Sequence, residues 1–125
     1  MKNSDIILID CSFISEGWTP SCSLVIYTIR LVQGFLKYGH SQVHVLVWRE
    51  WEYLFNEFII QQENKIVLDR SDLTTSWRPY YRLTGFLPGK LKKEISRRNI
   101  SVVLNPFHYG TLFFYPSKIP KERNI

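Results

Sequence analysis

The sequence predicts an α/β domain with a Rossmann-like parallel sheet flanked by helices, and two observations support this fold class. Short, nearly continuous apolar runs recur along the chain, at 6–9, 43–48, 65–69 and 102–104. Such runs are typical of strands buried on both faces. Segments with helical spacing separate them, and this alternation favours parallel βαβ units. At 125 residues, 45% of them hydrophobic, the chain fits a single domain over 1–125 with its own core.

The clearest helix is expected over 23–38, directly after the loop that follows the first strand. Two neighbouring apolar stripes at spacing three and four give this segment a wide apolar face. Ser21 or Ser23 is suited to cap its start, and Gly39 is suited to a left-handed residue after its end.

Two further helices and two irregular segments complete the expected order. A short amphipathic helix is predicted over 50–60, and a basic helix over 88–98 that Pro88 opens and Asn99 ends. The stretch 70–79 has no clear period, and a helical turn or two is expected over 80–86. The tail from 105 onward is expected to be a loop with one helical turn near 112–115. Doubly wound domains usually carry five or six strands, so we expect this four-stranded sheet to be incomplete at its carboxyl end.

Composition narrows the classes of function. The net charge of +5 favours acidic partners such as phosphorylated ligands, anionic lipid or nucleic acid. The chain has no apolar stretch long enough to span a membrane, and its first apolar run is too short for a secretory signal, so we expect a cytoplasmic protein. Cys11 and Cys22 form no metal-binding pattern. A disulfide between them is conceivable, but reduced thiols fit the cytoplasm better, and no metal or other cofactor is expected.

The loop after the first strand is one of two candidate binding segments, because parallel sheets bind ligands beyond the carboxyl ends of their strands. It leads into a helix amino-terminus, where backbone N–H groups favour an anion. We expect Glu16, Gly17, Thr19 and Ser21 to contact a ligand in the cleft. The alternative interpretation is an ordinary βα loop with a capping serine.

The second candidate segment follows the fourth strand. Asn105, His108 and Tyr109 lie there, and the histidine stands between aromatic residues that could stack on a sugar ring. A histidine packed within an aromatic loop is the alternative. His40 and His44 are expected to be structural or surface residues.

Several mechanisms are excluded or unsupported by the sequence. It contains no G-x-G-x-x-G and no G-x-x-x-x-G-K-[ST], so a standard dinucleotide fingerprint and a P-loop are both absent. Asp10 and Glu16 lie near the first loop, but nothing places a second carboxylate beside either, so a paired-carboxylate mechanism is not supported.

A basic run lies on the helix predicted over 88–98. Such a run is usually a solvated helix face, but it could also contact an anionic membrane surface or another anion. Aromatic residues interleaved with basic ones can also bind nucleic acid, yet no such signature is present and no nucleic-acid partner is expected. The residues of the run are Lys90, Lys92, Lys93, Arg97 and Arg98.

The order of these features resembles the amino-terminal domain of family 4 glycosyltransferases, the retaining GT-B enzymes. An S-x-G-x-T-P loop follows the first strand, and Tyr27 lies in the first turns of the helix. The segment L-x-x-G-F-L-K-Y-G-H-x-x-V-x-V-L covers Leu31 to Leu46. Leu87-Pro88, the basic helix and the stretch from Arg98 to Pro106 are similar to the family's passage into strand four.

The resemblance implies one acceptor-side half of an enzyme whose other domain holds a nucleotide-sugar donor. Such an enzyme transfers a sugar to a saccharide or lipid-linked acceptor, often in polysaccharide biosynthesis as a peripheral protein on the inner membrane face. It usually needs no metal, because side chains and helix ends stabilise the departing diphosphate.

The sequence departs from the family pattern in two places. Ser23 and Val25 stand where many relatives have paired glycines. A histidine in an H-D motif after strand five is missing, as is the acidic motif of the second domain, so catalytic residues are unassigned and His108 does not take that histidine's role. We therefore expect a truncated enzyme, inactive alone. The alternatives are a non-catalytic Rossmann-like interaction module that forms a homodimer and, further, a basic nucleic-acid-binding protein.

Overall fold

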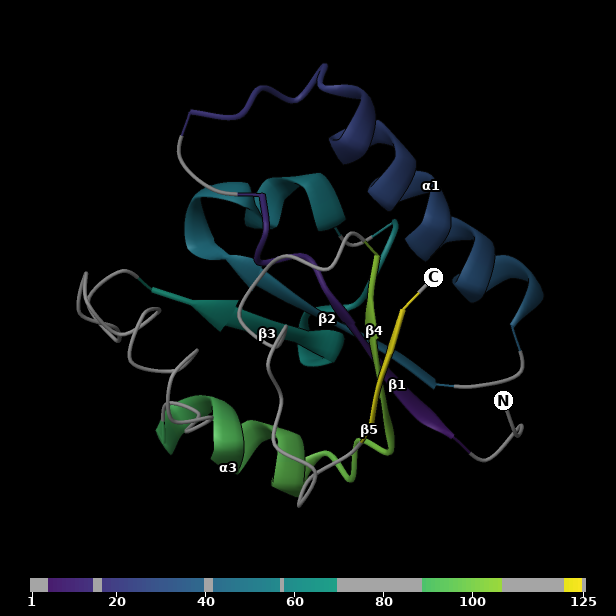
Figure 1. Cartoon of the computed structure of the whole chain (residues 1–125), viewed down its shortest axis with the longest axis vertical. Helices are drawn as coiled ribbons and strands as arrows, with labels where there is room; N and C mark the ends of the chain where they lie inside the picture. The colour runs from purple at the N-terminus through teal and green to yellow at the C-terminus, as the bar shows by residue number, and fades with distance from the viewer. Residues whose placement is uncertain are drawn as a thin grey trace.

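A computed structural model of the chain describes residues 5–14, 17–39, 42–56, 58–69, 89–106 and 121–124. Its centre is a five-stranded, fully parallel sheet in the order β3-β2-β1-β4-β5 (Figure 1). The strands are β1 (Ile6–Asp10), β2 (Gln42–Trp48), β3 (Lys65–Leu68), β4 (Val102–Asn105) and β5 (Lys121–Asn124). The predicted α/β, Rossmann-like fold class is confirmed.

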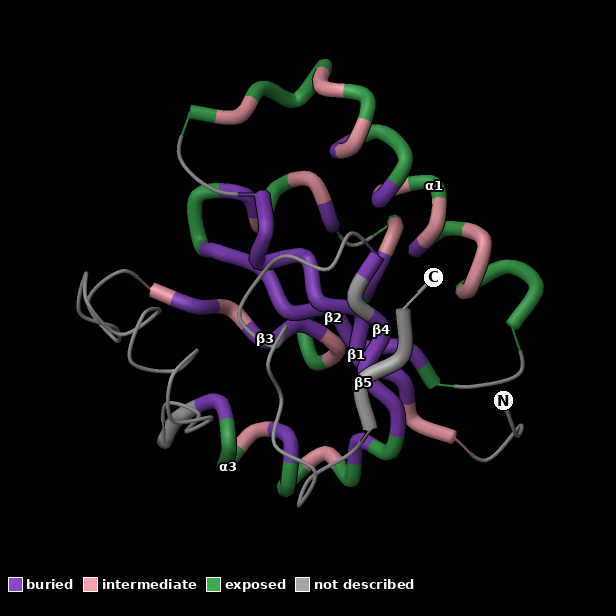
Figure 2. The backbone as a smooth tube through the Cα atoms, in the orientation of Figure 1, coloured by how far each residue is buried: buried purple, intermediate pink, exposed green. Residues whose placement is uncertain are grey.

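The core lies where β1 runs between β2 and β4. Ile7 pairs with Val43 on one side and Val102 on the other, and Leu8 and Ile9 are completely buried. Figure 2 shows the buried residues gathered along these central strands. A strand covered on both faces needs no alternation of apolar and polar residues, which explains the continuous apolar runs in the sequence.

Two α-helices lie on opposite sides of the sheet (Figure 1): α1 (Ser23–Tyr38) and α3 (Gly89–Arg97). The strand order reverses between β1 and β4, and right-handed crossovers on either side of such a reversal place their helices on opposite faces. From α1, Val25, Thr28 and Val32 are buried, and from α3, Leu91 and Ile95 are.

The ends of α1 differ from the prediction, although its span of 23–38 is confirmed. Neither serine caps the helix, because Cys22 is the N-cap residue and no side-chain cap hydrogen bond forms. Gly39 is extended, with φ −77°, rather than left-handed. Its amide donates to Phe35 O at 2.9 Å, and a Cβ at this glycine would collide with the same carbonyl oxygen. Close approach, and not a positive φ, therefore requires glycine at this position.

The short amphipathic helix predicted over 50–60 is confirmed only in its first half, where Trp51 and Phe55 are buried. A 3₁₀ helix, η1 (Arg49–Phe55), ends at Asn56, and a second, η2 (Gln62–Asn64), leads into β3. The Asn56 side chain accepts the Phe58 amide at 3.0 Å, which offers the backbone a turn in place of a further helical one. Phe58 is consequently 99% exposed instead of lying on a buried face.

The predicted count of four strands is also wrong, because β5 pairs in parallel with β4 from Val102↔Lys121 to Asn105↔Asn124. Its four residues, KERN, include no apolar residue, so the sequence pattern did not predict a strand here. The helix predicted over 88–98 is α3, with Asn99 at φ 55° just beyond its end. The expectations for 70–79, 80–86 and 112–115 lie outside the described residues.

Candidate functional site

The strand order reverses between β1 and β4, and this switch point is the place where open α/β sheets bind ligands. The loop after β1 leaves its carboxyl end and leads to the amino-terminus of α1. Asn105 is the last residue of the neighbouring β4. The two predicted binding segments therefore start side by side at one edge of the sheet.

Buried hydrogen bonds hold the start of the first loop. The Asp10 carboxylate, fully buried, accepts the Ser12 amide at 2.9 Å and the Ser12 hydroxyl at 2.6 Å. The Trp48 indole N–H, at the end of β2, donates to the Ser12 carbonyl at 2.8 Å. The loop therefore leaves the sheet in a direction that both strands determine.

Cys11 lies within this buried turn. Burial, with a smaller effect from the Asp10 charge, raises the pKa of its thiol well above the ordinary value. The thiolate is the reactive form of cysteine, so Cys11 is a packing residue and not a nucleophile. Cys11 and Cys22 are both free of disulfides, as expected.

The end of the loop presents hydroxyl groups to solvent at the start of α1. Thr19 Oγ1 and Ser21 Oγ lie 3.3 Å apart, both residues are exposed, and the Cys22 amide donates to Thr19 O at 3.0 Å. Gly17 has a φ of +87°, a conformation that favours glycine. Trp18 packs edge-to-face on Phe13, with ring centroids 5.8 Å apart, which anchors the loop to the core.

The structure describes four of the seven residues that were predicted to contact a ligand in the cleft. Gly17, Thr19 and Ser21 lie on the loop between β1 and α1, and Asn105 lies at the end of β4. Glu16, His108 and Tyr109 lie outside the described residues.

The basic run on α3 divides into two kinds of side chain. Lys92 and Lys93 are exposed, and the Arg97 side chain is 66% exposed while it pairs with Glu94 at 2.7 Å. Arg98, by contrast, is only 10% exposed. The side chain of Lys90 lies outside the described set. Because β4 starts shortly after α3 ends, the end of this run lies at the amino edge of the sheet, away from the switch point.

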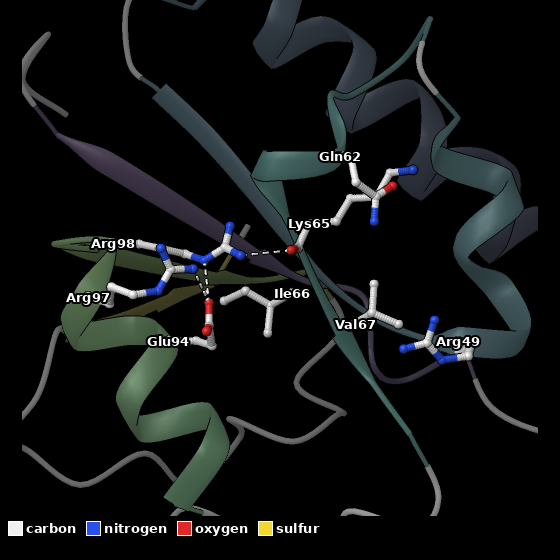
Figure 3. Close-up of a pocket in the computed structure, with 8 residues that line it drawn as sticks. All are labelled: Arg49, Gln62, Lys65, Ile66, Val67, Glu94, Arg97 and Arg98. Carbon is white, nitrogen blue, oxygen red and sulfur yellow. Dashed lines mark hydrogen bonds and ion pairs between the residues drawn. The ribbon is translucent and has the colours of Figure 1, made fainter.

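Arg98 points inward and joins α3 to two strands. Its guanidinium donates to Glu94 Oε2 at 2.8 Å, to Lys65 O at 2.9 Å and to the carbonyl of Glu63. Figure 3 shows it between Glu94 on α3 and the backbone of Lys65. It also lies 3.0 Å from His44 Nδ1 on β2. Since an arginine only donates, His44 Nδ1 accepts and the ring proton is on Nε2.

His44 is a buried structural residue, one of the two roles expected for it. Burial, and then the charges of Arg98 and Arg97, lower its pKa from 6.5 to about 4, so the ring is neutral at pH 7. Sequence reasoning did not connect it with Arg98, 54 residues away. The one available signal was a single histidine within the otherwise apolar strand 43–48.

The described residues hold no group of three or more histidine, cysteine or acidic side chains placed to bind a metal ion. No helix within the described ranges is long and apolar enough to cross a membrane.

Comparison with known proteins adds no relative: no protein-family model, curated protein or solved structure matches the chain. The resemblance to glycosyltransferases therefore stays a prediction.

Proposed function

We propose that this chain is the acceptor-binding domain of a glycosyltransferase of the GT-B kind. The observation that carries the proposal is the switch point between β1 and β4, with the exposed hydroxyls of Thr19 and Ser21 at the helix that follows β1. A crevice at this place is the general ligand site of open parallel sheets. The resemblance in the order of sequence motifs supports a saccharide as the ligand.

In this proposal the loop binds and orients an acceptor and performs no chemistry. Thr19 and Ser21 exchange hydrogen bonds with sugar hydroxyls, and Asn105 contributes from β4. Gly17 has a positive φ, and because it carries no side chain the backbone can turn at this exposed bend of the loop. A nucleotide-sugar donor would be held by a second domain, so transfer requires that domain. The intact enzyme would act in polysaccharide biosynthesis at the cytoplasmic face of the membrane.

Saccharide binding tests this proposal directly. We expect neutral oligosaccharides (chitobiose, lactose and maltotriose) to give saturation-transfer NMR signals with the protein for at least one member of the set. The bound sugar should shift the backbone amide signals of residues 17–19, 21, 22, 104 and 105. Neutral probes are chosen because a basic chain attracts anions at many places.

Matched variants decide whether the loop is responsible. The double variant Thr19→Val with Ser21→Ala should abolish the signal, since both side chains are exposed and their loss leaves the core intact. Ser96→Ala, an exposed serine on α3, is the control and should bind like the wild type. Amide shifts confined to other elements, or binding that the double variant retains, would contradict the acceptor assignment.

A non-catalytic interaction module remains the second candidate, because α1 exposes large apolar side chains. Ile26, Tyr27, Leu36 and Tyr38 are each at least 40% exposed. Exposed apolar faces of this kind are typical of contacts between proteins. Sedimentation equilibrium distinguishes the candidates: a stable dimer that Tyr38→Ser with Leu36→Ser dissociates, without any saccharide binding, would favour the module.

A further inference from the structure

A groove runs along the outer edge of β3, on the far side of β2 from the switch point (Figure 3). It encloses about 290 Å³. An adjoining hollow of about 380 Å³ shares Arg49, Gln62 and Lys65 with it. These volumes are at the lower end of the range for small-molecule sites. The polar side chains that line the groove are Arg49, Gln62, Lys65, Glu94, Arg97 and Arg98.

The arginines of this groove have acidic partners within the protein. Arg49 pairs with Asp69, with a second contact at 3.0 Å, and lies 3.8 Å from Glu52. The two arginines at the end of α3 share the single carboxylate of Glu94, at 2.7 and 2.8 Å. Among the described residues, three carboxylates thus lie beside three arginines around the groove. The arginine charges alone therefore leave no net attraction for an anion.

Lys65 breaks this balance. The residue is only 6% exposed and lines both hollows, yet no carboxylate within the described ranges forms an ion pair with it. Its charge therefore stands at the wall of both hollows without a carboxylate of its own among the described residues.

We propose that the groove along β3 binds a phosphate group, with the Lys65 ammonium as its central cation. Beside Lys65 the groove offers the Gln62 amide and the guanidinium edges of Arg49 and Arg97, and this mixture of donors suits an anion with several acceptor oxygens. The Gln62 amide is held in place by a 3.1 Å hydrogen bond to Glu52. Because β2 separates β3 from β1, this site is distinct from the saccharide crevice and does not depend on it.

Inorganic pyrophosphate is a suitable first probe, measured by isothermal titration calorimetry at low ionic strength. Lys65→Met keeps the apolar stem and removes the charge. Losing one charge-assisted contact should raise the pyrophosphate dissociation constant about tenfold or more. Lys92→Met, an exposed lysine of α3, lowers the net charge equally and should leave the constant within about twofold.

Thermal unfolding separates a binding role from a structural one. Without ligand, Lys65→Met should melt close to the wild-type temperature, because Lys65 forms no ion pair among the described residues. Pyrophosphate should raise the melting temperature of the wild type and not that of Lys65→Met. A lower melting temperature for unliganded Lys65→Met would overturn the proposal, and so would equal weakening of binding by Lys65→Met and Lys92→Met.

A phosphate group can belong to a soluble compound or to a lipid headgroup, and vesicles distinguish these sources. Phosphatidylcholine vesicles with and without phosphatidic acid are sedimented with each variant. Lys65-dependent binding to the acidic vesicles, together with pyrophosphate binding, identifies a lipid phosphate. Lys65-dependent pyrophosphate binding with no such vesicle binding identifies a soluble phosphate compound. Absence of both kinds of binding would overturn the proposal.

Discussion

The most direct test of the fold concerns Arg98. We predict that Arg98→Met lowers the free energy of unfolding by about 2–6 kcal/mol. The figure follows from two contacts in or beside the core, to His44 Nδ1 at 3.0 Å and to Lys65 O at 2.9 Å. An acceptor left unsatisfied inside a protein costs about 1–3 kcal/mol. Glu94 adds little to the loss, because it keeps its contact with Arg97 at 2.7 Å.

Arg97 supplies a matched control for this experiment. It is the preceding residue and contacts the same carboxylate oxygen, but its side chain is 66% exposed where that of Arg98 is 10% exposed. Exposed ion pairs contribute about 0–1 kcal/mol, so Arg97→Met should lower stability by less than about 1 kcal/mol.

Urea unfolding followed by circular dichroism measures both variants. If the unfolding free energy depends equally steeply on urea concentration in all variants, differences between their unfolding midpoints reflect stability alone. If Arg98→Met lost less than about 1 kcal/mol, or no more than Arg97→Met, the role of Arg98 as a clamp between α3 and the sheet would be refuted.

Two further predictions concern pH and the glycines of α1. His44 has a pKa of about 4 in the folded protein against 6.5 unperturbed, so the unfolded chain takes up its proton first. The free energy of unfolding should therefore fall as the pH is lowered from 6.5 to about 4, and His44→Gln, which keeps an acceptor for Arg98, should flatten this dependence. Equal urea midpoints for the wild type at pH 7 and 4.5 would contradict the assignment. Gly39→Ala should lower the free energy of unfolding by about 1–3 kcal/mol, because the added Cβ would collide with Phe35 O. Gly34→Ala should raise it by about 0.5–1 kcal/mol, because the Cβ added there meets open space. Thermal unfolding of the two variants checks the contrast, and a loss in both would show that helix geometry and not the collision determines the effect.

The parts of the fold that the sequence predicted well are those where burial and local pattern agree. The strands at 6–10, 42–48, 65–68 and 102–105 are largely apolar because both faces are covered, and each differs from the predicted run by one residue. The helix at 23–38 was predicted to the residue because its apolar face is wide and Gly39 follows it.

The errors arose where a single side chain or a distant partner decides the structure. Asn56 ended η1 by bonding the backbone, although the apolar spacing continued beyond it. The charged strand β5 is specified by its pairing with β4 and not by its own residues. Tertiary context overrides local preference in such an edge strand.

The candidate site was predictable in its place but not in its details. Because ligands of open parallel sheets bind beyond the carboxyl ends of the strands, the sequence indicated the loop that contains Thr19 and Ser21. The structure places both residues at the start of α1. The unpartnered charge of Lys65 was not visible in the sequence, where it begins an ordinary apolar run. Its burial depends on the packing of η1, η2 and α3 around the edge of the sheet.

The pairing of β1 with β4 has a consequence for the biosynthesis of this protein. Ile7 pairs with Val102, so β1 lacks its second neighbouring strand until the ribosome has synthesised β4. After β2 is complete, roughly 50 more residues must be synthesised before β4 begins, which takes several seconds at about 5–20 residues per second. During that interval β1 presents an apolar edge with free backbone groups, a template for pairing with other chains. Nascent or truncated chains that end before Val102 should therefore aggregate and depend on chaperones, whatever the stability of the finished domain.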